Sequence, residues 1–212
     1  MRFINKWSYA CAKGLAQALN ENHQRRFEYY YGFQILIGEF VKTAILIGTS
    51  LILGVFLPML IVSVAFIALR MIAGGYHMDT QGKCLLVSLI MFIAAALLAK
   101  YTYAYWSTLQ LAVLIAVTFL SGLYVVIKYA PKDNPNKPIT DPGEILKFKK
   151  LSVAYLLLWL AAAVILTLFK LNIFVVSSGF GVLLELFIVT PVGHRFFDRV
   201  KYGLRGRGAG NQ

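Results

Sequence analysis

Residues 58–99 read PMLIVSVAFIALRMIAGGYHMDTQGKCLLVSLIMFIAAALLA, and they indicate what kind of fold the chain adopts. Two apolar segments, 58–73 and 85–99, flank a polar, glycine-rich stretch that runs from Gly74 to Cys84. A membrane-spanning helix needs about 20 apolar residues, so both segments are short for a span. We interpret them either as short spans in a thinned bilayer or as a re-entrant pair, with the polar stretch as the hinge between them.

The whole chain is more apolar than a water-soluble domain. Of its 212 residues, 59% are hydrophobic and 14% are charged, whereas soluble domains are about half apolar and about a quarter charged. Six apolar segments separated by polar connections predict an all-α, polytopic membrane helical bundle in a single domain. The predicted segments are 36–57, 58–73, 85–99, 108–127, 151–169 and 171–189.

The regions outside these segments are polar and basic. Residues 1–31 are predicted to hold an amphipathic helix that extends to about residue 27 and either lies in the lipid interface or packs against the bundle. Residues 32–190 form the bundle. Residues 128–150 form a stiff, extended loop because they contain four prolines. Residues 191–212 form a basic tail.

Basic residues alternate between the connections. Eighteen Lys and Arg residues lie before the first segment, around the Gly74–Cys84 stretch, in loop 128–150 and in the tail, and two lie in the other connections. Because cytoplasmic loops carry the excess of Lys and Arg, we expect both termini, the stretch and the loop in the cytoplasm. Topology and anionic lipid then explain the net charge of +12, and no nucleic-acid partner is expected.

The glycine-rich stretch contains one histidine and one cysteine, His77 and Cys84. A histidine that removes the thiol proton makes a nucleophilic dyad. Seven residues of continuous helix would separate the two by about 10.5 Å, so the chain must reverse between them. Gly74, Gly75 and Gly82 permit such a turn, and Cys84 at the start of the next helix would favour the thiolate. From spacing alone, a pair without a catalytic role remains an alternative.

Other polar residues of the stretch suggest supporting roles. Asp79 either orients the imidazole or, like Thr80, caps the next helix. Free backbone N–H groups at that helix start, or the Gln81 side chain, would form an oxyanion hole. Arg70 and Lys83 add positive charge that favours a thiolate. A metal site needs about four ligands, which the stretch does not offer, so neither a metal nor a cofactor is expected.

Three charged residues lie inside predicted apolar segments, where charge is costly and usually faces the protein interior. Glu39 and Lys42 are three residues apart and are expected to form a local ion pair. Glu185 is expected to meet His194 or Arg195 at the cytoplasmic side.

Two motifs carry a family resemblance. Residues 70–84, RMIAGGYHMDTQGKC, resemble the signature of the AgrB family, the membrane cysteine endopeptidases of Gram-positive quorum sensing. Residues 128–139, KYAPKDNPNKPI, resemble that family's second signature, a basic proline-containing loop. The six-segment layout, the basic N-terminal helix and the length also match, so the resemblance covers nearly the whole chain.

The resemblance implies roles for individual residues. His77 and Cys84 match the family's catalytic pair, and Arg70, Gly74 and Gly75 match recurrent positions of the first signature. Asp79 matches no such position, so the resemblance gives it no role in a triad.

The resemblance also implies a substrate. AgrB-like enzymes remove the acidic C-terminal tail of a small propeptide, AgrD, and help to close the rest into a thiolactone or lactone ring. A thioester on Cys84 is the expected intermediate, and a homodimer is the expected assembly. Lys128, Lys132 and Lys137 either hold the acidic tail or serve only topology and lipid contact. Gln34 and Glu39, which are close to the cytoplasmic end of the first segment, are further candidates for substrate contact.

A rival interpretation is a small membrane transporter or peptide exporter without covalent catalysis. In that case Glu39, Lys42 and Glu185 would line a path through the bundle. His77 and Cys84 would then be dispensable.

Overall fold

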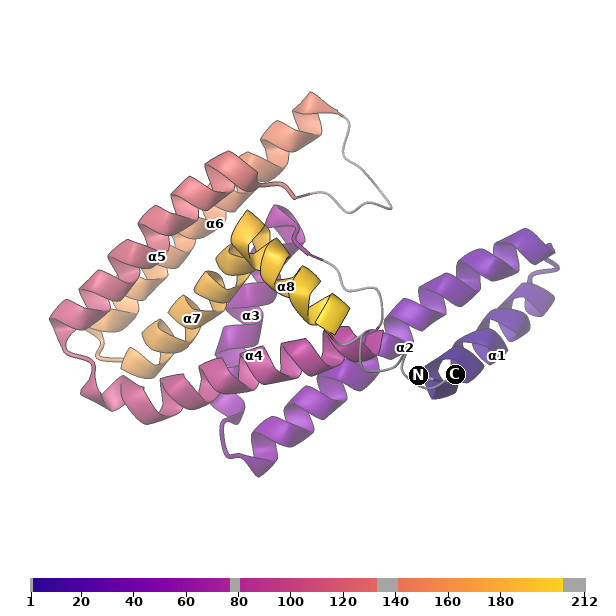
Figure 1. Cartoon of the computed structure of the whole chain (residues 1–212), viewed down its shortest axis with the longest axis horizontal. Helices are drawn as coiled ribbons and strands as arrows, with labels where there is room; N and C mark the ends of the chain where they lie inside the picture. The colour runs from indigo at the N-terminus through magenta and orange to yellow at the C-terminus, as the bar shows by residue number, and fades with distance from the viewer. Residues whose placement is uncertain (1, 77–80, 133–140, 204–212) are drawn as a thin grey trace.

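The computed structural model describes residues 2–76, 81–132 and 141–203, and these residues fold as a set of helices (Figure 1). Within these ranges, α2 to α7 are each long and apolar enough to cross a membrane. The predicted all-α membrane bundle is therefore confirmed. In chain order the elements are α1 (Arg2–Ala18), α2 (His23–Ile52), α3 (Phe56–Ala73), α4 (Gln81–Thr102), the 3₁₀-helix η1 (Tyr103–Tyr105), α5 (Thr108–Tyr129), α6 (Pro142–Leu168), α7 (Asn172–Val189) and α8 (Pro191–Gly203).

Helices α3 and α7 pack against each other in the middle of the bundle, with α5 and α6 on one side and α4 and α2 on the other (Figure 1). Small residues let them approach closely, because a side chain at Gly181 would collide with the backbone oxygen of Val62. One buried cluster joins α3, α5, α6 and α7, and contains Leu69, Leu111 and Val182. A second cluster joins α2, α3 and α4 to the end of α7 and to α8.

The N-terminal helix is shorter than predicted and the first span is longer. Helix α1 ends at Ala18 instead of near residue 27, and α2 begins at His23 instead of residue 36. Asn20 adopts a φ of 50° in the break, a left-handed conformation in which asparagine is enriched. Asn22 then caps α2 by accepting a hydrogen bond from the backbone N–H of Arg25 at 3.0 Å. Helix α1 lies against α2 through a buried stripe of Ile4, Ser8, Ala12 and Ala16.

The predicted loop 128–150 is also partly helical, because α6 begins at Pro142. The Asp141 carboxylate accepts a hydrogen bond from the backbone N–H of Gly143 at 3.1 Å and caps the helix. Proline suits the first turn, where its missing N–H has no helical partner to lose. The basic residues Lys147, Lys149 and Lys150 therefore lie on α6 and not in an extended loop.

The two short apolar segments become full-length helices. Helix α3 has 18 residues and α4 has 22, lengths of about 27 and about 33 Å at the α-helical rise. A hydrocarbon core is about 30 Å thick, so these lengths fit two spans better than a re-entrant pair.

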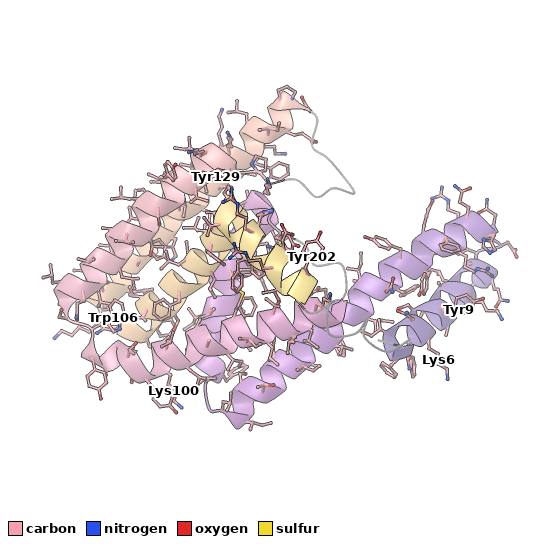
Figure 2. All side chains as sticks on the ribbon, in the orientation of Figure 1. Lys6, Tyr9, Lys100, Trp106, Tyr129 and Tyr202 are labelled. Atoms are coloured by element: carbon pink, nitrogen blue, oxygen red, sulfur yellow. The ribbon has the colours of Figure 1, made fainter. Side chains whose placement is uncertain are left out.

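The ends of the bundle are polar and aromatic. At the end away from the Gly74–Cys84 stretch, the Lys100 ammonium donates a hydrogen bond to the backbone oxygen of Gly54 at 2.9 Å. Figure 2 shows Lys100 and Trp106 at this end, and Tyr129 near the other end of α5. Aromatic and basic side chains at both ends are typical of helices that are anchored at two membrane interfaces.

Candidate functional site

The glycine-rich stretch begins with a turn that only glycine fits. Gly74 ends α3 with a φ of 76°, in the left-handed region that glycine adopts without strain. The backbone N–H of Lys132 donates a hydrogen bond to the Ala73 oxygen at 2.8 Å. A side chain at Gly74 would collide with the Lys132 backbone oxygen. The first and second signature stretches therefore touch through their backbones.

Gly75 follows with a φ of 144°. A side chain there would press against Arg70 of α3 and Glu185 of α7. Gly82, by contrast, is the second residue of α4 and is helical. Its predicted role in the turn is therefore wrong, because the chain has already re-entered a helix at Gln81.

Arg70 ties the turn to the bundle core. Its guanidinium donates a hydrogen bond of 2.6 Å to the backbone oxygen of Tyr76 and lies 3.4 Å from the Glu185 carboxylate. It also lies over the Phe66 ring. Glu185 is fully buried, and a buried charge needs a partner. Arg70 is that partner, so the expected pairing of Glu185 with His194 or Arg195 is wrong.

Helix α8 contacts the other side of the turn. The sequence predicts only a basic tail in this region, over residues 191–212. The Tyr76 hydroxyl donates a hydrogen bond of 2.8 Å to the Asp198 carboxylate. The Tyr76 ring stacks on Phe197 with centroids 5.5 Å apart and meets His194 edge-on at 5.2 Å. Helical spacing of apolar and charged residues between Pro191 and Gly203 is the signal that would have found this helix.

His194 lies in a partly buried, positively charged environment. Burial lowers its pKa, the nearby Lys132 and Arg70 lower it further, and Asp198 acts in the opposite direction. Its Nε2 atom is buried without a hydrogen-bond partner among the described residues. The neutral imidazole is therefore the form that this site favours.

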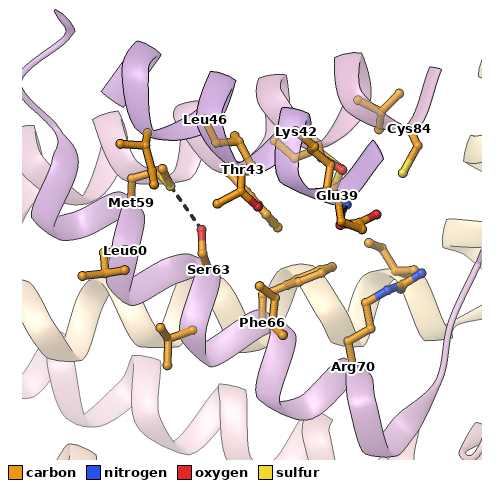
Figure 3. Close-up of a pocket in the computed structure, with 18 of the residues that line it drawn as sticks. Glu39, Lys42, Thr43, Leu46, Met59, Leu60, Ser63, Phe66, Arg70 and Cys84 are labelled. Carbon is orange, nitrogen blue, oxygen red and sulfur yellow. Dashed lines mark hydrogen bonds and ion pairs between the residues drawn. The ribbon is translucent and has the colours of Figure 1, made fainter. Parts of the chain in front are cut away.

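Cys84 is the fourth residue of α4, and its thiol is free and partly buried. It lines a cavity of about 500 Å³ between α2, α3 and α4, and Arg70 and Tyr76 line the same cavity. Figure 3 shows Cys84, Glu39 and Arg70 at one end of this cavity and Met59 and Leu60 at the other. A thiol and a guanidinium group therefore share one end of a mostly apolar chamber.

Two of the further candidates lie on α2 but in different surroundings. Glu39 forms the expected ion pair with Lys42, and both line the cavity. Gln34 instead donates a hydrogen bond of 2.8 Å to Asn5 and joins α2 to α1. This contact gives Gln34 a place in the helical hairpin, away from the residues that line the cavity.

The basic candidates lie at the end of α5. Lys132 is exposed and lies beside the turn through its backbone contact with Ala73. The Lys128 ammonium donates a hydrogen bond of 2.8 Å to the Tyr124 hydroxyl and faces the rings of Tyr124 and Tyr129. Lys132 is therefore next to the site, whereas Lys128 is held by neighbouring aromatic residues.

Three predicted site residues, His77, Asp79 and Lys137, lie outside the described residues. Gln81 is described only as the first residue of α4, so its side chain is not placed. The turn before His77 and the helix that carries Cys84 are both described.

Comparisons with known proteins identify relatives across most of the chain. The sequence model of the family described as accessory gene regulator B matches residues 8–189. A Clostridium perfringens protein named putative AgrB-like protein 2 is 26% identical over 199 residues, 90% of this chain and 93% of the relative. The accessory gene regulator protein B of Staphylococcus epidermidis is 26% identical over 91% of this chain and 93% of its own length. That of Staphylococcus saprophyticus is 29% identical over 74% and 79%. No solved structure matches the chain.

Proposed function

The chain belongs to the accessory gene regulator B family of quorum-sensing proteins, and from this membership we propose that it is a membrane cysteine endopeptidase. Its substrate is an AgrD-like propeptide, from which it removes the C-terminal tail before the remaining peptide closes into a thiolactone or lactone ring. The position of Cys84 carries the proposal, because a free thiol in the first turn of α4 lines a cavity that it shares with Arg70.

The first half-reaction forms an acyl-enzyme. His77 takes the Sγ proton of Cys84, and the thiolate attacks the carbonyl carbon of the scissile peptide bond. The carbon–nitrogen bond then breaks, and the imidazolium returns its proton to the leaving amine. The tail departs with a free amino terminus, and the rest of the propeptide stays on Cys84 as a thioester.

The second half-reaction closes the ring. A Cys thiol or Ser hydroxyl within the bound peptide attacks the thioester carbon, His77 accepts its proton, and the Cys84 thiolate leaves. Exchange of a thioester for a thiolactone is nearly balanced in energy, so the cysteine nucleophile conserves the energy of the cleaved bond. Water must be excluded during this step, because hydrolysis would release a linear product. The apolar cavity beside Cys84 supports this requirement.

The start of α4 supplies candidate groups for the oxyanion. The first N–H groups of a helix have no helical acceptor and point outward from its N-terminus. Those of Gln81 and Gly82 precede Cys84 in the first turn. We assign them to the tetrahedral oxyanion, with the Gln81 side chain as a further donor and Asp79 as a candidate to orient His77.

Basic residues near the turn are candidates for holding the acidic tail. Lys132 lies beside the turn, and Lys128 and Lys137 belong to the same connection. Opposite charge in this region would guide the tail to the site and away from the apolar cavity. These lysines also belong to the basic set of connections, and this charge bias supports a cytoplasmic position for the site and both termini in a Gram-positive cell membrane, with anionic lipid as a partner. A homodimer is the proposed assembly.

The rival transporter interpretation requires Glu185 to line a path through the bundle. Glu185 is instead fully buried against Arg70 and is not among the described residues that line the cavity. This arrangement favours the peptidase.

The experiment is cleavage of a tagged AgrD-like propeptide by purified enzyme in liposomes, with products identified by mass spectrometry. Cys84→Ala and His77→Ala should each abolish tail release and the acyl-enzyme mass on Cys84. Cys11→Ala is the matched control and should keep both, because Cys11 is on α1. Full tail release by Cys84→Ala would contradict the proposal.

A further inference from the structure

The cavity extends well beyond the reacting atoms. Its volume is about 500 Å³, within the range of about 300–1,000 Å³ that is usual for ligand sites. The proposed chemistry uses only the end that carries Cys84. The rest of the wall comes mainly from α2, α3 and α4, with Ile188 of α7 and Phe197 of α8. It is mostly apolar, and its larger side chains include Leu46, Met59, Phe66, Met91 and Phe92.

We propose that this chamber binds the apolar side chains of the substrate residues immediately before the scissile bond. The inference rests on the proposed function and adds a substrate preference. The part of the propeptide that forms the thioester with Cys84 has apolar residues next to the reacting carbonyl group. The residues after the scissile bond stay outside the chamber.

The covalent chemistry gives the direction. After the peptide bond breaks, the portion before it remains attached to the Cys84 sulfur, within a few bonds of the chamber wall. The portion after it must leave. A thioester survives until ring closure only where water is excluded. Apolar side chains of the attached portion that fill the chamber would exclude that water, whereas a departing segment could not.

The polar groups of the wall fit a peptide better than a lipid chain. Peptide N–H and C=O groups need hydrogen-bond partners when they leave water. Thr43, Ser63 and Ser88 place hydroxyl groups on the three helices that form the chamber. The Ser63 hydroxyl lies 3.1 Å from the Met59 sulfur (Figure 3), and sulfur is a weak acceptor. A peptide oxygen would replace that partner readily, and an acyl chain offers none.

Helix α2 provides a way in from the bilayer. Only 11% of the residues in its apolar stretch are buried inside the bundle, compared with 22% for α4 and 39% for α3. The wall that α2 contributes is therefore the one with the least packing to lose when it moves. A propeptide that lies at the membrane surface would enter by displacing this helix.

Thiol labelling tests the chamber without any substrate. Methyl, butyl and hexyl methanethiosulfonates each form a mixed disulfide with a thiolate and release methanesulfinate. Their rates are measured by intact mass for Cys84 in a Cys11→Ala protein. Rates for Cys11 in a Cys84→Ala protein correct for partitioning of the reagents into detergent or lipid.

After this correction, the hexyl reagent should modify Cys84 roughly tenfold faster than the methyl reagent, because its chain fills apolar space. Ser63→Phe and Ser88→Phe each narrow the chamber and should remove this preference. Ile90→Phe on α4 should keep it, because Ile90 is 60% exposed and is not among the described residues that line the chamber. Equal corrected rates for all three reagents in the wild-type background would overturn the proposal.

Cleavage kinetics then test the direction. In a propeptide that the wild-type enzyme cleaves, Asp in place of the residue before the scissile bond should lower kcat/KM by roughly 100-fold. The same change after the bond should lower it by less than roughly threefold. If Ser63→Phe changes the labelling rates but Asp before the scissile bond does not lower kcat/KM for any propeptide, the chamber holds lipid and the proposal fails. Cleavage by Cys84→Ala would instead refute the proposed function.

Discussion

The hydroxyl of Tyr76 donates a hydrogen bond of 2.8 Å to the carboxylate of Asp198, across 122 residues of sequence. It joins the residue before His77 to α8, and the backbone oxygen of the same Tyr76 accepts a hydrogen bond from Arg70. The turn is therefore held from two sides at the point where the proposed general base follows.

Asp198→Ala should lower kcat for tail cleavage by roughly tenfold and leave KM unchanged. A hydrogen bond to a charged group contributes about 1.5–3 kcal/mol, and its loss would loosen the turn that precedes His77, the proposed general base. Asp198 is not among the described residues that line the cavity, so substrate binding should not change. Steady-state kinetics in liposomes measure both constants.

Tyr76→Phe tests the same hydrogen bond from the other residue, because it removes the hydroxyl and keeps the ring that stacks on Phe197. It should reproduce the kcat effect of Asp198→Ala, and the double variant should be no worse than either single variant. Tyr105→Phe is the control, since Tyr105 is 83% exposed in η1. Additive losses in the double variant would show that the two residues do not act through one contact.

Arg70→Ala should destabilise the protein by about 1–3 kcal/mol, because it leaves the buried Glu185 carboxyl group and the Tyr76 backbone oxygen without their hydrogen-bond donor. Adding Glu185→Gln should restore part of this free energy of unfolding, since an unpaired amide costs less to bury than an unpaired ionisable carboxyl group. Glu39→Gln breaks an ion pair whose carboxylate is 59% exposed and should cost less than about 1 kcal/mol. Unfolding in detergent compares the four proteins. No recovery in the double variant would contradict the pairing.

Gly74→Ala should prevent the α3 turn from forming and should abolish cleavage. The new methyl group would collide with the Lys132 backbone oxygen, and alanine would be strained at the Gly74 φ of 76°. Moving the Lys132 backbone or changing this φ would each cost free energy. Gly48→Ala is the matched control, because a side chain there meets open space on α2. It should stabilise the helix by about 0.5–1 kcal/mol and keep activity. Wild-type activity in Gly74→Ala would show that the turn is not required.

Hydropathy predicted the spans because a bilayer imposes long apolar runs on any helix that crosses it. It misplaced the start of α2 by 13 residues, from 36 to His23, because it reports the apolar run and not the helix that continues beyond it. It also missed α8, which is short and has too many charged residues to stand out as a span.

The predicted site residues came from the glycine-rich break and from the resemblance of its residues to a known signature. The contacts that hold this break, Arg70 with Glu185 and Tyr76 with Asp198, join residues 115 and 122 positions apart. No local periodicity relates such positions, so a single sequence offers no physical signal for them. These two contacts form only because the folded bundle packs α7 and α8 against the end of α3.

The environment of His194 makes a prediction about pH. Burial and the positive charges of Lys132 and Arg70 lower the pKa of His194 in the folded protein, against the opposing effect of Asp198. In the unfolded chain the imidazole takes up a proton at its ordinary value of about 6.5. Below that value the unfolded state therefore binds more protons than the folded state, and the stability that His194 contributes is lost as the pH falls through its folded pKa.

Thermal unfolding of the wild type should shift to lower temperature between about pH 7.5 and about pH 5, and His194→Gln should reduce this shift, because glutamine takes up no proton in either state. The remaining shift in the variant belongs to other titrating groups. His23→Gln is the control, since His23 is exposed at the start of α2, and it should leave the shift unchanged. Parallel curves for the wild type and His194→Gln would mean that the imidazole takes up a proton equally well in the folded and unfolded states, and that α8 does not hold it in its neutral form.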